Sequence, residues 1–109
     1  MEWTNMLTIL NNCSKSTILN IYWSNGLIIK GIIDTFSETD NCLEENDPDY
    51  KEYYMCVVEI TDIVQLPIQD IFNEKVGDLI ELSVLNEPIK IEQEGKGIIW
   101  KINTQTKLG

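Results

Sequence analysis

The fold of this chain is decided by residues 19–36, which read LNIYWSNGLIIKGIIDTF. The first six residues alternate apolar with more polar side chains, a pattern that predicts a strand with one face turned inward. The dipeptide Asn25-Gly26 follows, and it predicts a tight hairpin turn because both residues accept a positive φ angle. The rest of the stretch, to about Phe36, should be a second strand in which Gly31 marks a bulge or a sharp bend.

Outward from this hairpin, the sequence predicts a helix before it and four more strands after it. Trp3, Met6, Leu7 and Leu10 recur at helical spacing, and we expect this stripe and Trp100 to lie in the core. The expected elements are a helix over about 3–11, a strand over 18–24, a strand over 27–36, a polar loop over 37–49, a strand over 50–63, a short helix or turn over 68–75, and strands over 79–85, 89–93 and 98–102.

These elements predict a mainly β fold. Six short strands with one helix favour a small, strongly bent antiparallel β-barrel with a short amino-terminal helix, because closure of the barrel hides the sheet edges. The length of 109 residues suits a single domain spanning the whole chain. Within it we expect the barrel over about 17–102 and a loose tail over 103–109.

The composition argues against catalysis, because the chain contains no histidine and none of its eight basic residues is an arginine. Without histidine there is no imidazole to carry protons near neutral pH, to activate a nucleophile or to bind zinc as a nitrogen ligand. Without arginine there is no planar group for bidentate phosphate recognition. We therefore predict a protein that is not an enzyme, with no catalytic residue, no cofactor and no metal site.

Three cysteines, Cys13, Cys42 and Cys56, are an odd number with no closely spaced pair. This pattern indicates free thiols in a reducing compartment rather than a disulfide framework or a zinc site. No apolar run is long enough for a signal peptide or a membrane span. The expectation is a cytoplasmic protein with no membrane segment.

The negative charge of the chain is concentrated in one short stretch. Of the formal net charge of -10, residues 34–52 account for -7, through eight acidic residues and one lysine. Clustered carboxylates of this kind attract a basic protein and select against acidic partners. We therefore predict a non-enzymatic acidic binding module that docks onto a basic protein partner, in the manner of an immunity protein, an antitoxin or a phage-type inhibitor.

The residues predicted to bind this partner are the acids of the stretch and the two aromatic residues that follow it. Two alternatives remain open for the stretch itself: a solvated acidic loop, and a calcium site that lacks the spacing of an EF-hand loop. One of the two tyrosines faces outward if the strand is regular, unless neighbouring residues partly cover both. The residues are Glu38, Asp40, Glu44, Glu45, Asp47, Asp49, Glu52, Tyr53 and Tyr54.

The first hairpin also resembles the first sequence motif of the Sm and Sm-like family, over about residues 18–43. In that motif an Asn-Gly turn is followed at fixed spacing by a glycine, an aromatic residue and an asparagine, and Gly26, Gly31, Phe36 and Asn41 hold those positions here. The resemblance implies an Sm-like or SH3-like bent barrel and, as the alternative function, an RNA-binding or ring-forming protein.

The resemblance also implies a candidate nucleic-acid set, which consists of Lys30, Thr39 and Asn41. The family's second motif has no counterpart after Thr61. A net charge of -10 repels nucleic acid, so the acidic-module hypothesis stands first. Because the additional segment 65–102 could cover the edges that pair in Sm-like rings, we predict a monomer or a dimer.

Overall fold

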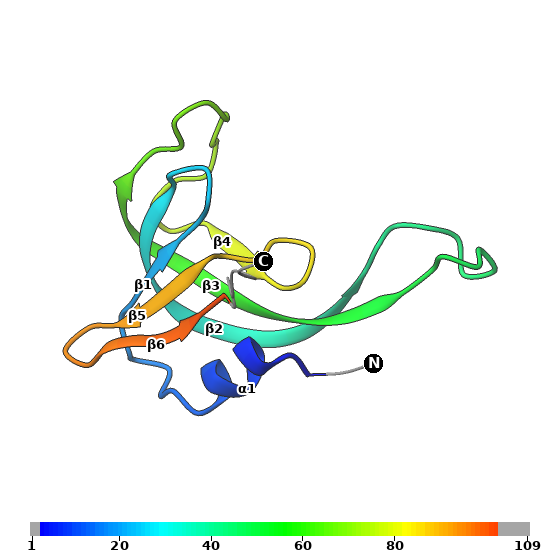
Figure 1. The fold of residues 1–109 in the computed structure, drawn as a ribbon, viewed down its shortest axis with the longest axis horizontal. Helices are drawn as coiled ribbons and strands as arrows, with labels where there is room; N and C mark the ends of the chain where they lie inside the picture. The colour runs from blue at the N-terminus through cyan, green and yellow to red at the C-terminus, as the bar shows by residue number, and fades with distance from the viewer. Residues whose placement is uncertain (1–2, 103–109) are drawn as a thin grey trace, which may run out of the picture.

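The structure, a computed structural model, describes residues 3–102 and consists of one antiparallel sheet with one short helix (Figure 1). The strand order in the sheet is β4-β3-β2-β1-β5-β6. The helix is α1 (Asn5–Asn11), and the strands are β1 (Leu19–Tyr22), β2 (Ile28–Asp40), β3 (Glu52–Gln65), β4 (Leu79–Leu82), β5 (Lys90–Gln93) and β6 (Gly97–Lys101).

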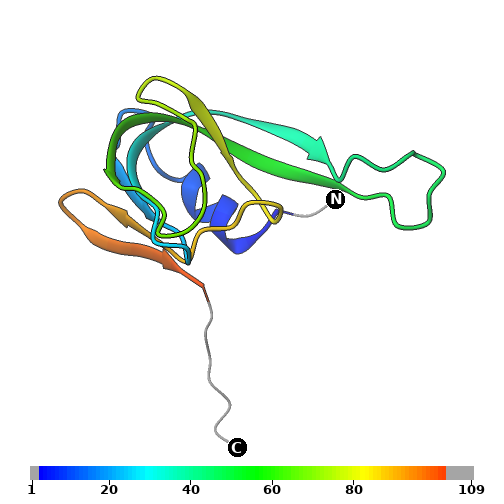
Figure 2. The same ribbon diagram turned by 90° about the horizontal axis from the view of Figure 1, so that it is seen from above.

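The mainly β prediction is confirmed, but the sheet does not close into a barrel. Within the described residues β4 and β6 are the two edges of the sheet, and they do not pair with each other. The long strands β2 and β3 curve strongly, so that the whole sheet is bent and has a concave side, as Figures 1 and 2 show. Each edge strand is short, but residues 32–40 of β2 also have a strand neighbour on one side only, because β1 pairs with β2 only over residues 28–31.

The first hairpin forms where the sequence predicts it, although its turn differs from the predicted one. The amide of Gly26 donates to the carbonyl of Trp23 at 3.1 Å, and the amide of Trp23 donates to the carbonyl of Leu27 at 2.9 Å. Gly26 has a φ of +97°, whereas Asn25 keeps a negative φ. The loop is therefore the three-residue form, with glycine in the left-handed position. The Asn25 side chain accepts a hydrogen bond from the amide of Leu27 at 3.1 Å.

Gly31 marks a bulge, as predicted. The register between β2 and β3 shifts between Lys30 and Gly31. A Cβ atom at Gly31 would clash with the side chain of Val58 and would lie only 2.8 Å from the carbonyl oxygen of Glu59. A glycine is therefore required here, because β3 crosses too closely for any side chain.

The core lies between the concave side of the sheet and α1. Thr4 caps the helix by accepting a hydrogen bond from the amide of Leu7 at 3.2 Å, and the helix then lies against β3 and β6. The inward-facing residues predicted for β1 are buried, and so is Trp100. The buried apolar residues are Met6, Leu7, Leu10, Leu19, Ile21, Trp23, Leu27, Ile29, Ile33, Cys56, Val58, Ile60, Leu82, Ile91 and Trp100.

Trp3 does not lie in the core, which corrects the sequence prediction. It precedes the helix, and 44% of its surface remains exposed. Its ring stacks on Tyr54 with the centroids 4.9 Å apart and lies tilted against Phe36 at 5.7 Å. The helical stripe includes Trp3 by spacing alone, but the helix begins two residues later, so the indole reaches outward along β2 and β3 instead.

The second strand continues to Asp40, where the sequence predicted a loop from Ser37. The polar residues Ser37–Asp40 pair in register with β3, from Ser37 opposite Met55 to Asp40 opposite Glu52. Strand pairing uses backbone groups, so a polar run can extend a sheet beyond the core. The loop that remains covers residues 41–51.

Of the short helix or turn predicted over 68–75, no helix forms, and the loop between β3 and β4 is held by tertiary hydrogen bonds. The amide of Ile68 donates to the carbonyl of Asn25 at 3.0 Å, and the Asn25 amide group donates to Asp70 at 2.8 Å. Gln65 donates from its side chain to the carbonyl of Gly26 at 2.6 Å. These bonds to the first turn take the place of the bonds that a helix would have formed.

Two further expectations concern the limits of the chain. The tail predicted over 103–109 lies outside the described residues, and the single-domain organisation stays a prediction. Among residues 3–102, no helix has both the length and the apolar character needed to cross a membrane.

Candidate functional site

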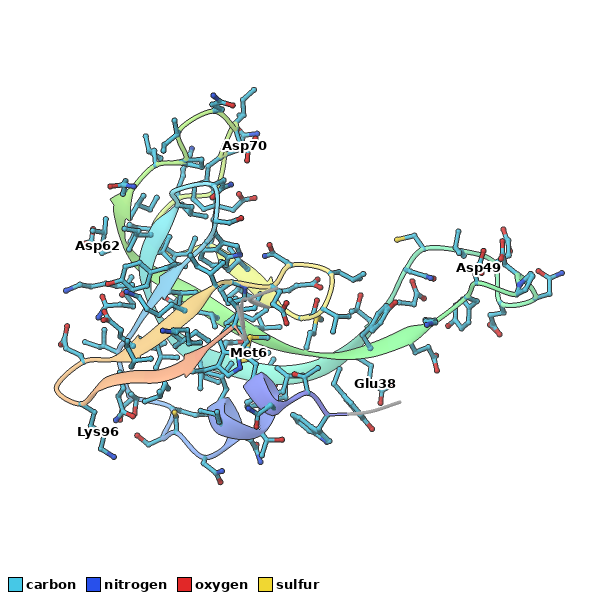
Figure 3. The ribbon with its side chains drawn as sticks, viewed as in Figure 1. Met6, Glu38, Asp49, Asp62, Asp70 and Lys96 are labelled. Atoms are coloured by element: carbon cyan, nitrogen blue, oxygen red, sulfur yellow. The ribbon has the colours of Figure 1, made fainter. Side chains whose placement is uncertain are left out.

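The acidic stretch forms a hairpin that projects from the body of the molecule. We call residues 34–54 the acidic arm; it consists of the outer part of β2, the loop 41–51 and the first residues of β3. Figures 1 and 2 both show the arm extending away from the rest of the sheet. In Figure 3, Glu38 lies near its base and Asp49 near its tip.

All nine residues predicted to bind a partner lie on this one arm. Five of the acids are exposed, namely Glu38, Glu44, Glu45, Asp49 and Glu52. The other four residues, Asp40, Asp47, Tyr53 and Tyr54, are half-buried. The structure thus brings the predicted residues together, while their role in binding stays a prediction.

The arm's carboxylates carry charge that the described part of the chain does not neutralise. The two ion pairs found among residues 3–102 join Lys30 to Glu94 and Lys90 to Glu92, and neither includes an arm residue. Asp40 lies directly opposite Glu52 across the two strands. Like charges in such a position repel each other. The repulsion among the arm's acids therefore lowers the stability of the isolated protein.

Asn41 holds the neck of the arm's loop closed. Its side-chain amide donates to the carbonyl of Asp49 at 2.8 Å, and its side-chain oxygen accepts from the amides of Leu43 and Lys51 at 3.4 and 3.3 Å. Cys42, the next residue, takes a φ of +64°. These hydrogen bonds therefore fix the conformation in which the loop carries its acidic side chains.

Tyr50 lies near the end of the same loop and contacts the first residue of β3. Its hydroxyl donates to Oε2 of Glu52 at 3.0 Å. Partial burial, this hydrogen bond and the neighbouring carboxylates raise the pKa of Tyr50 to about 12. The phenol therefore stays neutral near physiological pH and remains a hydrogen-bond donor.

The two tyrosines at the base of the arm lie on opposite faces of the sheet. Tyr54 pairs with Glu38 and packs under the ring of Trp3, whereas Tyr53 pairs with Thr39 on the other face. Both are half-buried, which matches the alternative in which neighbouring residues partly cover both. Trp3 thus belongs to the arm's base, a position that its spacing with the helix concealed.

The candidate nucleic-acid residues are not brought together. Lys30 and Thr39 are nine positions apart on β2, and Lys30 is paired with Glu94 at 3.3 Å near the opposite end of the sheet. Asn41 is occupied by the loop neck. The set therefore does not form one surface.

Sequence reasoning missed a cleft beside the arm. Its volume is about 570 Å³, and its walls include Thr39 and Asp40 from the arm, Phe72 from the β3–β4 loop, and Leu79 and Leu85 from β4 and the turn that follows it. Phe72 of the β3–β4 loop was a signal for this surface, but the spacing of the apolar residues of that loop predicts a short helix or turn. Within residues 3–102, no group of three or more His, Cys, Asp or Glu side chains could hold a metal ion.

An open sheet that presents a projecting acidic arm and an adjacent cleft defines a small protein-binding module. A family model described as cognate immunity protein YxxD matches residues 1–104. The chain therefore belongs to the YxxD family of cognate immunity proteins, whose function is to bind a cognate partner protein. Neither the curated proteins nor the solved structures include a match to this chain.

This assignment confirms the predicted class of function and corrects the resemblance to the Sm-like family. The matching family is one of immunity proteins, and it covers nearly the whole chain rather than the first hairpin alone. The resemblance was wrong because an Asn-Gly turn followed by a glycine is a general solution for a strongly bent hairpin. The alternative function, an RNA-binding or ring-forming protein, rested on this resemblance and is therefore not supported.

Proposed function

We propose that this chain protects against its cognate toxin by binding it, without catalysing a reaction, and that the acidic arm is the surface that first meets the toxin. The observation that carries this proposal is the net charge of -7 on residues 34–52, placed on a projecting hairpin. The family assignment indicates a cognate protein partner. The negative charge of the arm indicates that this partner carries a basic face, because oppositely charged surfaces attract each other.

The arm acts mainly on the rate of encounter. A concentrated negative field attracts a basic partner from a distance and orients it before contact. Salt screens this field over a Debye length of about 8 Å at physiological ionic strength, so the effect weakens as salt is added. The half-buried Tyr53 and Tyr54 then supply aromatic contact area at the arm's base.

The composition supports an inhibitor rather than an enzyme. A chain with no histidine lacks the side chain that most often moves protons near neutral pH. The three cysteines are free thiols, which supports action in a reducing compartment such as the cytoplasm.

The test removes three of the eight acidic charges of the arm and keeps the shape of each side chain. In the arm variant, Glu44→Gln, Glu45→Gln and Asp49→Asn replace three exposed acids whose side chains make no hydrogen bond within the described chain. We expect association with the toxin to slow by about tenfold at low ionic strength, because the steering field is weakened. Stopped-flow association at several salt concentrations measures the change.

The control variant removes the same number of acidic charges elsewhere, through Asp62→Asn, Glu87→Gln and Glu94→Gln, all exposed and outside the arm, and the last of these also breaks the exposed ion pair with Lys30. It should associate almost as fast as the unmodified protein. Equal association rates for the arm variant and the unmodified protein at every salt concentration would contradict the proposed role of the arm. A chain that binds no toxin and protects no cell would contradict the immunity function itself.

A further inference from the structure

The cleft lies between the arm and the opposite end of the curved sheet. Four parts of the chain that are distant in sequence form its walls: the base of the arm, the β1–β2 turn, the β3–β4 loop, and β4 with the turn that follows it. A volume of about 570 Å³ is enough to admit several atoms of a partner's side chains.

The charge of the cleft is negative on three of its walls. Asp40 comes from the arm, Glu74 from the β3–β4 loop and Glu81 from β4, whereas none of the thirteen lining residues is basic. Glu81 is held in place, because the hydroxyl of the fully buried Ser83 donates to its Oε2 at 2.5 Å. Carboxylates arranged in this way attract a cation and repel an anion.

The remaining lining is largely apolar and partly open. Leu79 and Leu85 keep 53% and 49% of their surface exposed, and the half-buried Phe72 and Ile80 lie beside them. Lysine and arginine side chains combine an apolar stem with a charged head. The apolar walls of the cleft can pack against such a stem, and its three carboxylates can pair with the charged head. The apolar walls can also accept apolar residues that lie beside the lysine or arginine.

Trp23 provides an independent indication of an occupant. It lines the cleft, is nine-tenths buried, and its indole Nε1 is the buried side-chain polar atom without a hydrogen-bond partner in the described chain. Buried donors without an acceptor are rare in native proteins and call for an explanation. A backbone carbonyl of the occupant, reached by a small movement of the partly exposed walls, would satisfy this donor.

We propose that the cleft receives a lysine or arginine side chain of the cognate toxin, together with the apolar residues beside it. This inference rests on the proposed immunity function but gives the cleft a task different from that of the arm. The arm raises the rate of encounter, whereas the cleft slows dissociation, because a charge pair buried in an interface acts on the dissociation rate.

The test uses the cognate toxin, defined as the protein against which this chain protects cells. In the cleft variant, Glu74→Gln and Glu81→Gln remove two carboxylates and keep their shape; a glutamine at position 81 can still accept from Ser83. We expect the dissociation rate constant to rise at least about 30-fold, with little change in association. The control variant Asp62→Asn with Glu87→Gln removes the same charge outside the cleft and should leave dissociation unchanged.

A second measurement uses the unmodified chain and does not depend on how the variants fold. The chain has three tryptophans, so ¹⁵N labelling gives three indole signals. On toxin binding we expect the Trp23 signal to move as its N–H gains an acceptor, while the signal of Trp100, which lies outside the cleft, stays in place.

The outcomes separate the two proposals. A normal dissociation rate for the folded cleft variant, or a Trp23 signal that does not move in the complex, would overturn the inference about the cleft and leave the arm's role intact. Normal association by the arm variant, with rapid dissociation by the cleft variant, would overturn the arm's role and support the cleft.

Discussion

At the scale of single residues, the structure requires glycine at two positions, Gly26 and Gly31. Gly26 adopts a φ that other residues rarely take, and a Cβ atom there would come 3.0 Å from Ile68. Gly31 has an ordinary φ but no space, because β3 passes directly over it. The sequence pattern indicated both positions as special, and the structure supplies a different reason for each.

Gly31→Ala should destabilise the protein. The added Cβ atom meets the backbone of Glu59 and the side chain of Val58, so β2 and β3 must move apart at the bulge. We expect a loss of about 1–3 kcal/mol in the free energy of unfolding, typical of an overpacked core position. Urea denaturation measures it. Ser37→Ala, at an exposed position of the same strand, should change stability by less than about 0.5 kcal/mol. Equal midpoints for the two variants would show that the bulge can accept a side chain.

At the scale of elements, the outer part of the arm is held in place by its own hydrogen bonds and not by packing against the core. Its strands continue past the buried residues through backbone pairing, and its loop closes through Asn41. Elements of this kind open and close without unfolding the rest of the protein. The arm's shape therefore depends on a few hydrogen bonds that can be removed one at a time.

Asn41→Ala should loosen the loop and leave the core intact. The amides of Leu43 and Lys51 lose their side-chain acceptor, and the carbonyl of Asp49 loses its donor. We expect faster hydrogen exchange at those two amides, with a change in global unfolding free energy below about 1 kcal/mol because the site is exposed. Asn46→Ala, an exposed change in the same loop, is the control and should leave both exchange rates as they are. Unchanged exchange in Asn41→Ala would show that the turns alone order the loop.

At the scale of the whole molecule, a net charge of -10 acts against compactness. The ion pairs of the described chain lie outside the arm, so no ion pair there offsets the repulsion among the arm's acids. The two edges of the sheet, β4 and β6, are short. Residues 32–40 of β2 lack a strand on their other side, so the edges do not settle the assembly state, and the monomer or dimer stays a prediction for light scattering to test.

Added salt should stabilise the isolated protein. Raising the ionic strength from about 0.01 M to about 0.15 M shortens the Debye length from about 30 Å to about 8 Å and so weakens repulsion among the acids. We expect the melting temperature to rise with sodium chloride, measured by circular dichroism. The rise should be smaller for the variant with Glu44, Glu45 and Asp49 neutralised. A melting temperature independent of salt in both proteins would mean that the arm's charges are already compensated.

The sequence alone was sufficient for the features that arise from neighbouring residues. The alternation before Asn25 with the turn at Gly26, the glycine at position 31 and the helical stripe from Met6 to Leu10 act over a few positions, and they predicted the first hairpin, the bulge and α1 respectively. The clustering of acids between Asp34 and Glu52 is also local, so the concentration of charge and the class of function could be predicted without coordinates, whereas the role of these acids in binding stays a prediction.

Only the tertiary structure decided the features in which distant segments meet. Pairing with β3 carried β2 through a polar run to Asp40, and bonds to the first turn kept the segment around Ile68 from forming a helix. The open sheet and the cleft depend on how far β2 and β3 curve, and Trp3 is placed by Tyr54, which is far along the chain. Periodicity reports only which side chains share a face of one element, whereas backbone hydrogen bonds and packing between remote segments determine where that element ends and what covers it.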